Sequence, residues 1–287
     1  MTAEIAIVTS IAELRAALDA ERAAGRSVGF VPTMGYLHDG HGSLIEAAAA
    51  ANDVTFVSIF VNPLQFAPGE DLEAYPRDLE ADAALSVAAG AALIFAPSVE
   101  EMYAEPILTN VHVNTVSDPL EGRHRPTHFD GVSTVVSKLF AIAGPCRAYF
   151  GEKDWQQLAI VRRMASDLSF PVEVVGCPIV READGLAMSS RNVYMTSDER
   201  AQAVILHRAL RHGVEVIEAG ERDPDVVERA ITTMIERQPA AEIDYVGVVD
   251  ATTLLELAPL AGEVRLLTAT RFGKARLLDN MGVVVPD

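Results

Sequence analysis

The chain has little cysteine, little positive charge and no long apolar run. Only Cys146 and Cys177 occur among its 287 residues, and they lie too far apart for a closely spaced zinc cluster or a disulfide framework. No apolar stretch approaches the roughly 20 residues that cross a bilayer. The first ten residues, MTAEIAIVTS, also lack the basic flank of a secretory signal. We therefore expect a cytoplasmic protein without a membrane partner.

Positive charge is scarce as well, since 23 Lys and Arg residues stand against 41 Asp and Glu residues, a net charge of −18. A field of this sign repels nucleic acids and anionic membranes. We expect no nucleic-acid partner, and an anionic ligand must be held by a local pocket that overrides the global charge.

The most informative segment covers residues 28–44, VGFVPTMGYLHDGHGSL. A short apolar run suited to a buried parallel strand ends at Pro32, and glycines then allow close approach of the backbone to a ligand. A helix is predicted to begin near Gly42. His38 and His41 come just before it, and a helix N-terminus attracts anions, so the pair indicates a phosphate site. Either histidine alone would more often be a surface residue or a cap, but this pair follows a strand and encloses a glycine.

Strands and helices alternate along the first two thirds of the chain. Apolar runs predict strands at 28–31, 54–60, 92–96, 148–150 and 172–175, with helices between them at 42–51, 78–89, 132–143 and 155–168. The capping box of Ser10 and Glu13 predicts another helix before the first strand. Because parallel strands are joined by helical crossovers, the alternation predicts an α/β fold with a doubly wound, Rossmann-like parallel sheet.

The pattern changes near residue 182. Thr196 and Glu199 form a second capping box, which predicts a helix to about residue 219, and Asp223-Pro224 predicts the start of the next helix. Strand-like runs follow, the last two as a hairpin around Gly273. We therefore predict a larger domain of residues 1–182 and a smaller C-terminal α+β domain of residues 183–287.

Three further segments carry polar side chains where α/β proteins bind ligands, after parallel strands or on a loop between domains. They are Asn62 and Gln65, the segment Gly151, Lys153, Asp154 and Gln157, and the loop Met188-Ser189-Ser190-Arg191. Each has an ordinary alternative: glutamines at strand ends usually face water, a lysine at a helix start is commonly solvated, and the serine loop could be a simple turn between domains.

Taken together, the motifs resemble a known family. The stretch HDGH at 38–41 resembles the HxGH signature of the nucleotidylyltransferase superfamily. The stretches PTMGYLHDGHGSL at 32–44, FGEKDWQQ at 150–157 and MSSRN at 188–192 are similar to the pantothenate synthetase family, and the similarity extends over most of the chain. MSSRN also resembles the mobile KMSKS loop of class I aminoacyl-tRNA synthetases. Departures such as Trp155, where Tyr or Phe is expected, remove no catalytic side chain.

The resemblance implies an ATP-dependent condensation of (R)-pantoate with β-alanine, through a pantoyl-adenylate, that releases AMP and pyrophosphate. It implies His38, His41 and Lys153 as catalytic residues. It further implies that ATP contacts Met34, His38, His41, Gly151, Lys153, Asp154, Val180, Met188, Ser189, Ser190 and Arg191, and that pantoate and β-alanine contact Met34, Asn62, Gln65 and Gln157. The larger domain then binds ATP and pantoate, the smaller one acts as a lid, and the enzyme is a homodimer.

Mg²⁺ is expected with ATP. Asp82 falls where some members of the family hold the ion, although an acidic run such as residues 78–82 is more often a solvated face. Mg²⁺ commonly binds through nucleotide phosphates and water, with few protein ligands.

The proposed chemistry fits these residue types. A pantoate carboxylate is already anionic and needs no general base, and neutral amides can position it without removing its nucleophilicity. Two alternatives stay open. A nucleotidylyltransferase that stops after AMP transfer would need basic residues in its acceptor pocket, and a nucleotide-sensing module without turnover would not need His38, His41, Lys153 and Arg191 together.

Overall fold

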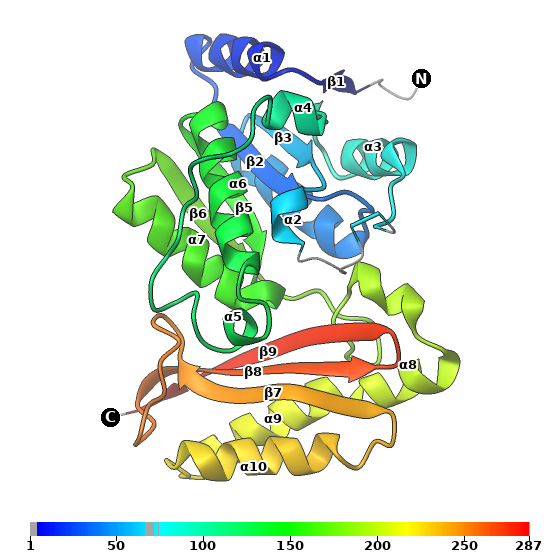
Figure 1. The fold of residues 1–287 in the computed structure, drawn as a ribbon, viewed down its shortest axis with the longest axis vertical. Helices are drawn as coiled ribbons and strands as arrows, with labels where there is room; N and C mark the ends of the chain where they lie inside the picture. Colours follow the sequence, from blue (N-terminus) through cyan, green and yellow to red (C-terminus); the bar gives the residue numbers. More distant parts are fainter. Residues whose placement is uncertain (1–4, 67–71, 74, 287) are drawn as a thin grey trace. The chain divides into compact units, whose positions relative to one another are not determined.

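The computed structural model describes residues 5–66, 72, 73 and 75–286, which fold into two compact units (Figure 1). The first unit consists of Met1–Val113, Arg125–Glu152 and Ile160–Pro178, and the second consists of Asn114–His124, Lys153–Ala159 and Ile179–Asp287. Each unit therefore combines separate stretches of sequence. The predicted division of the chain into an ATP- and pantoate-binding domain of residues 1–182 and a lid domain of residues 183–287 stays a prediction.

The first unit is built on a six-stranded sheet in which every strand pair is parallel. The strand order is β1-β4-β3-β2-β5-β6. The bounds are β1 (Ala6–Val8), β2 (Val28–Thr33), β3 (Val54–Ile59), β4 (Leu93–Phe95), β5 (Cys146–Gly151) and β6 (Val172–Cys177). The chain winds outward in opposite directions from β2 and β5, so the predicted doubly wound, Rossmann-like sheet is confirmed.

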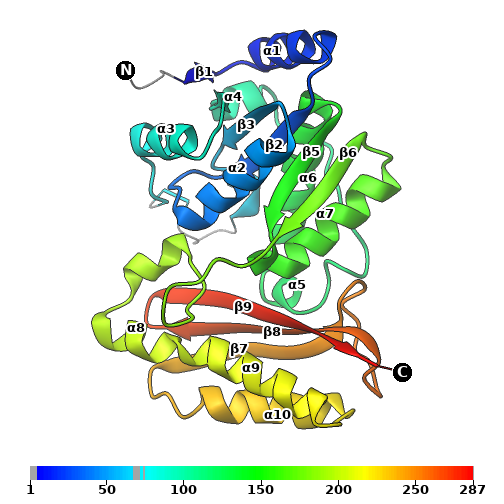
Figure 2. The ribbon, with the colours of Figure 1, turned by 180° about the vertical axis from the view of Figure 1, so that it is seen from behind.

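Helices flank this sheet, as Figures 1 and 2 show. They are α1 (Ile11–Ala23), α2 (Asp39–Ala51), α3 (Leu79–Ala88), α4 (Val99–Met102), α6 (His128–Ala143) and α7 (Trp155–Asp167), with 3-10 turns η1 (Pro63–Gln65) and η2 (Glu152–Asp154). The predicted capping box opens α1, where Ser10 Oγ accepts a hydrogen bond from the Glu13 N–H at 3.2 Å. In the core, the rings of Phe30 and Phe56 stack with centroids 4.4 Å apart.

The second unit contains a three-stranded antiparallel sheet, and the helices of residues 205–218 and 224–235 pack on one of its faces (Figure 2). Its elements are α5 (Glu121–His124), η3 (Ser190–Tyr194), α8 (Ser197–Ala203), α9 (Ile205–Glu218), α10 (Pro224–Ile235), β7 (Ala241–Asp250), β8 (Gly262–Phe272) and β9 (Ala275–Val285). The predicted hairpin around Gly273 is confirmed. The predicted helix to residue 219 is interrupted at Val204, and Leu210, Ile231 and Leu266 are fully buried between helices and sheet. None of the helices in the described ranges is long and apolar enough to cross a bilayer.

Candidate active site

The predicted site residues of the first unit follow the carboxyl ends of three adjacent strands. Met34 and His38 follow β2, Asn62 and Gln65 follow β3, and Gly151 ends β5. The chain reverses its winding direction between β2 and β5, and open α/β sheets bind ligands at such a point. The topology therefore gathers these five residues at one edge of the sheet.

The turn after β2 depends on a left-handed backbone. Gly35 has φ +83° and Tyr36 has φ +53°. A Cβ on Gly35 would lie 2.9 Å from Asp82 Oδ2, so the turn accepts only glycine there. The turn leads into α2, which begins at Asp39 and therefore three residues before the predicted start.

Buried Asp82 holds this turn in place. Its Oδ2 accepts a hydrogen bond from the Tyr36 N–H at 2.9 Å, and its Oδ1 accepts one from the Leu37 N–H at 2.6 Å. Burial raises the pKa of the Asp82 carboxyl, although the two N–H groups act in the opposite direction. The residue is 2% exposed, so the expected solvated acidic face is wrong at this position. The Mg²⁺ role of Asp82 stays a prediction.

His38 and His41 form the first turn of α2. His38 Nδ1 accepts a hydrogen bond from the Gly40 N–H at 3.1 Å, and the His38 N–H donates to His41 Nδ1 at 3.3 Å. The two rings lie with centroids 4.2 Å apart. Because both Nδ1 atoms are acceptors, each neutral ring carries its proton on Nε2. The start of α2 thus combines two imidazole N–H donors with the positive end of a helix dipole, an arrangement suited to a phosphate.

Asn62 and Gln65 are brought together after β3. Asn62 Nδ2 donates to Gln65 Oε1 and to the Gly131 carbonyl, both at 3.1 Å. Asn62 Oδ1 accepts from the Leu64 N–H at 3.3 Å and from the Tyr103 hydroxyl at 2.9 Å. These four bonds use the full capacity of the Asn62 amide. They also fix the Gln65 amide, whose Nε2 donates to no atom among the described residues.

Helix α6 fixes the backbone of the same segment. A Cβ on Gly131 would overlap the Leu64 carbonyl oxygen, so the helix lies directly against η1. Arg125 Nη2 and His128 Nδ1 donate to the Gln65 carbonyl at 3.2 and 3.1 Å. Sequence reasoning missed Gly131, because a glycine inside a helical pattern gives no sign of what packs against it.

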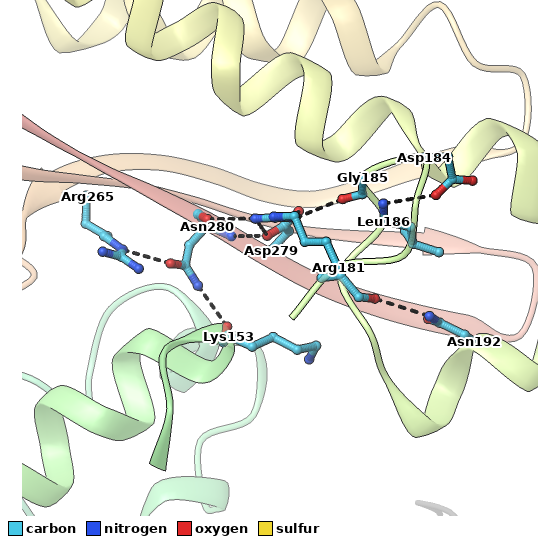
Figure 3. A network of polar contacts seen from close by, with 10 residues as sticks. Lys153, Arg181, Asp184, Gly185, Leu186, Asn192, Arg265, Asp279 and Asn280 are labelled. Carbon is cyan, nitrogen blue, oxygen red and sulfur yellow. Dashed lines mark hydrogen bonds and ion pairs between the residues drawn. The ribbon is translucent and has the colours of Figure 1, made fainter. Parts of the chain in front are cut away.

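In the second unit, Lys153 and Asp154 lie on the 3-10 turn that precedes α7. Lys153 Nζ and Asp154 Oδ1 are 3.7 Å apart, and the Lys153 side chain is 20% exposed. The Lys153 carbonyl accepts a hydrogen bond from Asn280 Nδ2 at 2.8 Å (Figure 3). A half-buried ammonium on an anchored turn is suited to bind an anion.

The two adjacent glutamines of α7 have different environments. Gln156 is 4% exposed, and its Nε2 donates to the Val116 and Pro119 carbonyls at 2.9 and 2.8 Å. Gln157, one residue later, is half-buried. Gln156 is therefore a structural residue, and Gln157 is the glutamine whose amide suits a ligand.

The serine loop starts with a short antiparallel ladder. The Met188 N–H donates to the Val180 carbonyl at 3.0 Å, and Ser189 Oγ accepts from the Arg191 N–H at 3.2 Å to cap η3. Ser190 and Arg191 are half-buried. In the described part of the chain, the Arg191 guanidinium makes no ion pair. The loop thus offers a hydroxyl and a guanidinium, the donors that a triphosphate requires.

Across residues 5–66, 72, 73 and 75–286, no three His, Cys, Asp or Glu side chains gather into a group that could hold a metal ion.

A model of the family described as pantoate-beta-alanine ligase matches residues 6–282. The pantothenate synthetase of Moorella thermoacetica is 52% identical over 281 residues, which cover 98% of this chain and 99% of that protein. The pantothenate synthetase of Heliobacterium modesticaldum is 53% identical over 279 residues, which cover 97% and 99%.

Solved structures are similar too. The crystal structure of pantothenate synthetase from Thermus thermophilus has a TM-score of 0.91 at 51% identity and covers 96% of this chain and 99% of its own. The structure of pantoate-beta-alanine ligase from Francisella tularensis, complexed with beta-gamma ATP and beta-alanine, has a TM-score of 0.79 at 32% identity and covers 96% and 97%.

Proposed function

The chain belongs to the pantoate-beta-alanine ligase family, and from this premise we propose how its own residues carry out the ATP-dependent condensation of (R)-pantoate with β-alanine. The observation that carries the proposal is the cap of α2, where His38 and His41 present two Nε2–H donors at a helix N-terminus. Such preorganised donors stabilise the negative charge that develops on phosphate oxygens during transfer.

In the first step, a carboxylate oxygen of pantoate attacks the α-phosphorus of ATP. The bond between this phosphorus and the bridging oxygen breaks, and pyrophosphate leaves with the electron pair. The carboxylate needs no base because it is already ionised. His38, His41 and Lys153 donate to the phosphate oxygens, so catalysis consists mainly of positioning and electrostatics.

In the second step, the amine of β-alanine attacks the acyl carbon of pantoyl-adenylate. The bond from this carbon to the adenylate oxygen breaks, AMP leaves, and the nitrogen loses a proton. The sequence contains no G-x-S-x-G nucleophile elbow, which supports an activated acyl group that is carried by the substrate and not by the enzyme.

Amides bind the acid in this proposal. Gln65 and Gln157 donate to the pantoate hydroxyls and carboxylate, and Met34 adds apolar contact. We propose that Asn62 acts on pantoate through Gln65, because its four hydrogen bonds already lie within the protein. The remaining predicted ATP contacts are Gly151, Asp154, Val180, Met188, Ser189, Ser190 and Arg191.

Mg²⁺ enters with ATP in this proposal. Asp82 fits a metal ligand poorly, because both carboxylate oxygens already accept N–H groups of the turn after β2. Mg²⁺ is commonly held by substrate phosphates and water, and when bound it would neutralise charge on the phosphates.

Three further inferences accompany the activity. Cys146 and Cys177 are unpaired thiols, which suits a reducing compartment such as the cytoplasm. The family resemblance implies a homodimer. It also implies that residues 1–182 bind ATP and pantoate while residues 183–287 act as a lid.

An isotope-exchange assay tests the proposed function. Labelled pyrophosphate should enter ATP when pantoate and Mg²⁺ are present and β-alanine is absent, and exchange should vanish without pantoate. Exchange that requires β-alanine would indicate a concerted route, and release of ADP with phosphate would indicate acyl-phosphate chemistry. Accumulated adenylate without pantothenate would indicate a plain nucleotidylyltransferase, and no turnover at all would indicate a binding module.

A further inference from the structure

Strand β9 carries two buried polar residues in succession. Asp279 is 3% exposed and Asn280 is 2% exposed. Successive side chains of a strand point to opposite faces of its sheet. Asp279 shares its face with Ala275 and Leu277, which pack in the core beneath the helices, and Asn280 lies on the other face. Buried polar side chains destabilise a core unless they are hydrogen-bonded, so the partners of this pair indicate what it does.

Asn280 contacts the turn that carries Lys153. Its Nδ2 donates to the Lys153 carbonyl at 2.8 Å, and its Oδ1 accepts from Arg265 Nε at 2.7 Å (Figure 3). The Arg265 guanidinium lies 3.6 Å from the ring centroid of Trp155. Trp155 Nε1 in turn donates to the Ala251 carbonyl at 2.8 Å. The amide of Asn280 is thus held in one orientation, and it holds the backbone of Lys153.

Asp279 contacts the start of the serine loop. Its Oδ2 and Oδ1 accept from Arg181 Nη1 and Nη2 at 2.7 and 2.8 Å, a bidentate ion pair. Arg181 Nη1 also donates to the Gly185 carbonyl at 3.1 Å, and Arg181 pairs with Ala187 in an antiparallel bridge. Residues 181–187 thus form a short hairpin, which Figure 3 shows beside the Asp279 and Asn280 side chains.

The base of the hairpin is also tied to η3. Asn192 Nδ2 donates to Glu182 Oε1 at 3.2 Å and to the Ala187 carbonyl at 3.1 Å. Ser189 and Arg191 lie between these fixed points. The position of both side chains therefore depends on the Arg181 anchor at the base of the hairpin.

We propose that Asp279 and Asn280 are positioning residues that anchor the two phosphate-binding segments of the second unit, Asn280 the turn of Lys153 and Asp279 the loop of Ser189 and Arg191. This inference rests on the proposed function, which assigns both segments to ATP. A single dipeptide does this because β9 turns one side chain to each face.

Two substitutions at Asn280 test its part. Asn280→Asp keeps the acceptor for Arg265 but has no N–H for the Lys153 carbonyl, and Asn280→Leu removes both contacts at similar volume. We expect kcat to fall about tenfold to a hundredfold in both, because a displaced catalytic group acts through geometry. The KM for pantoate should change less than twofold. Native fluorescence of Trp155, the single tryptophan of the chain, should shift in Asn280→Leu but not in Asn280→Asp.

A double-variant cycle separates positioning from a general structural effect. In a Lys153→Ala background, Asn280→Asp should lower kcat no further, because the group that it positions is gone. Thr270→Val is the matched control: Thr270 is fully buried in β8 of the same sheet, and its hydroxyl lies 3.2 Å from Thr268 Oγ1. It should lose stability without losing kcat.

Asp279→Asn tests the other anchor. The amide oxygen still accepts one hydrogen bond from Arg181, and the side chain is neutral. The loop should therefore loosen without leaving a buried, unpaired carboxylate at position 279. We expect the KM for ATP to rise severalfold with a smaller change in kcat. The Asn280 variants, in contrast, are expected to act mainly on kcat.

The outcomes are distinguishable. If Lys153→Ala keeps normal turnover, the assigned role of Lys153 fails and the inference fails with it. If Lys153→Ala is inactive but the Asn280 variants keep their kcat, the inference is overturned and the proposed function stands. Additive losses in the double variant, or equal effects of Asp279→Asn on kcat and on the KM for ATP, would also overturn it.

Discussion

The two segments that carry most of the predicted phosphate donors are held by different kinds of contact. In the first unit, the turn before α2 is fixed by backbone N–H groups, which donate to the buried Asp82 carboxylate and to imidazole Nδ1 atoms. In the second unit, the serine loop is fixed by the ion pairs of Arg181 with Asp279 and of Arg200 with Glu182 and Asp184. The first set is at least partly buried and centres on the buried Asp82 carboxylate, whereas part of the second is exposed.

These contacts indicate which segment is preorganised and which can rearrange. Hydrogen bonds to the buried Asp82 carboxylate form with the packing of α2 and α3 and are little affected by salt. Partly exposed ion pairs contribute little individually and weaken in salt. We therefore expect the cap of α2 to keep one geometry through the reaction, while the outer pairs of the serine loop can open and close.

Arg181→Met should give the largest effect, because it leaves the Asp279 charge buried without its ionic partner. The free energy of unfolding of the second unit should fall by about 3–5 kcal/mol. Trp155 belongs to this unit, so its fluorescence in urea measures the loss. The double variant Arg181→Met with Asp279→Leu should recover much of the stability, and a loss below about 1 kcal/mol in the single variant would contradict a buried anchor.

His41→Ala should lower kcat about a hundredfold, since one preorganised donor to a developing charge is worth roughly 3 kcal/mol. Thermal unfolding should change much less than turnover, because Asp82 still holds the turn. Pyrophosphate release with pantoate and β-alanine measures the rate. His212→Ala, at an exposed histidine of α9, is the control and should keep full activity. Near-normal turnover of His41→Ala would make His41 a structural cap only.

Asp82→Ala should have a smaller effect on stability, about 1–3 kcal/mol, because the N–H groups of Tyr36 and Leu37 lose their acceptor in a buried turn. The rate should fall with it, since these groups fix the cap that carries His38. Asp82→Asn keeps one acceptor and should lie between wild type and Asp82→Ala. Steady-state kinetics at rising Mg²⁺ discriminate the two roles of Asp82: recovery of the rate at high Mg²⁺ would favour a metal ligand over an anchor.

The smallest effect is a pair of opposite pH dependences. Burial raises the pKa of Asp82, so its contribution to stability is greatest below the ordinary value of 3.8 and is lost as pH rises through the raised pKa. The hydrogen bond from Arg200 lowers the pKa of Asp184, so its contribution is present above 3.8 and is lost as pH falls through the lowered pKa.

Unfolding free energies across the acid range check the two signs. The difference between wild type and Asp82→Asn should decrease as pH rises, and the difference between wild type and Asp184→Asn should increase. Parallel slopes for the two variants would show that the two segments do not differ in this way.

Local signals in the sequence predicted much of the fold. The capping boxes of Ser10 and Thr196 involve residues three apart, and both open helices where predicted. The hairpin at Gly273 and the apolar strands are equally local. Their prediction succeeded because the residues that form these interactions lie within a few positions of one another in the sequence.

Contacts between distant residues could not be predicted in this way. Strand β1 has only three residues, two of them exposed, and it exists because it pairs with β4. The sequence indicated a solvent-exposed carboxylate at Asp82, because its partners Tyr36 and Leu37 lie about 45 residues away in sequence. The contacts of Asp279 with Arg181 and of Asn280 with Lys153 span 98 and 127 residues. Neither the hydrophobic periodicity of the sequence nor any short motif in it predicts such pairs.

The alternation of side chains along β9 has a consequence for what the chain can tolerate during evolution. A slip of β9 by one residue against β8 would turn every side chain to the opposite face. Asp279 would then leave Arg181, and Asn280 would leave Lys153, in a single event. The short connection at Gly273 joins β8 to β9, and surface turns of this kind usually accept insertions. Here an insertion that shifts the register would also turn Ala275 and Leu277 out of the core, so the length of this turn is constrained by catalysis and by stability together.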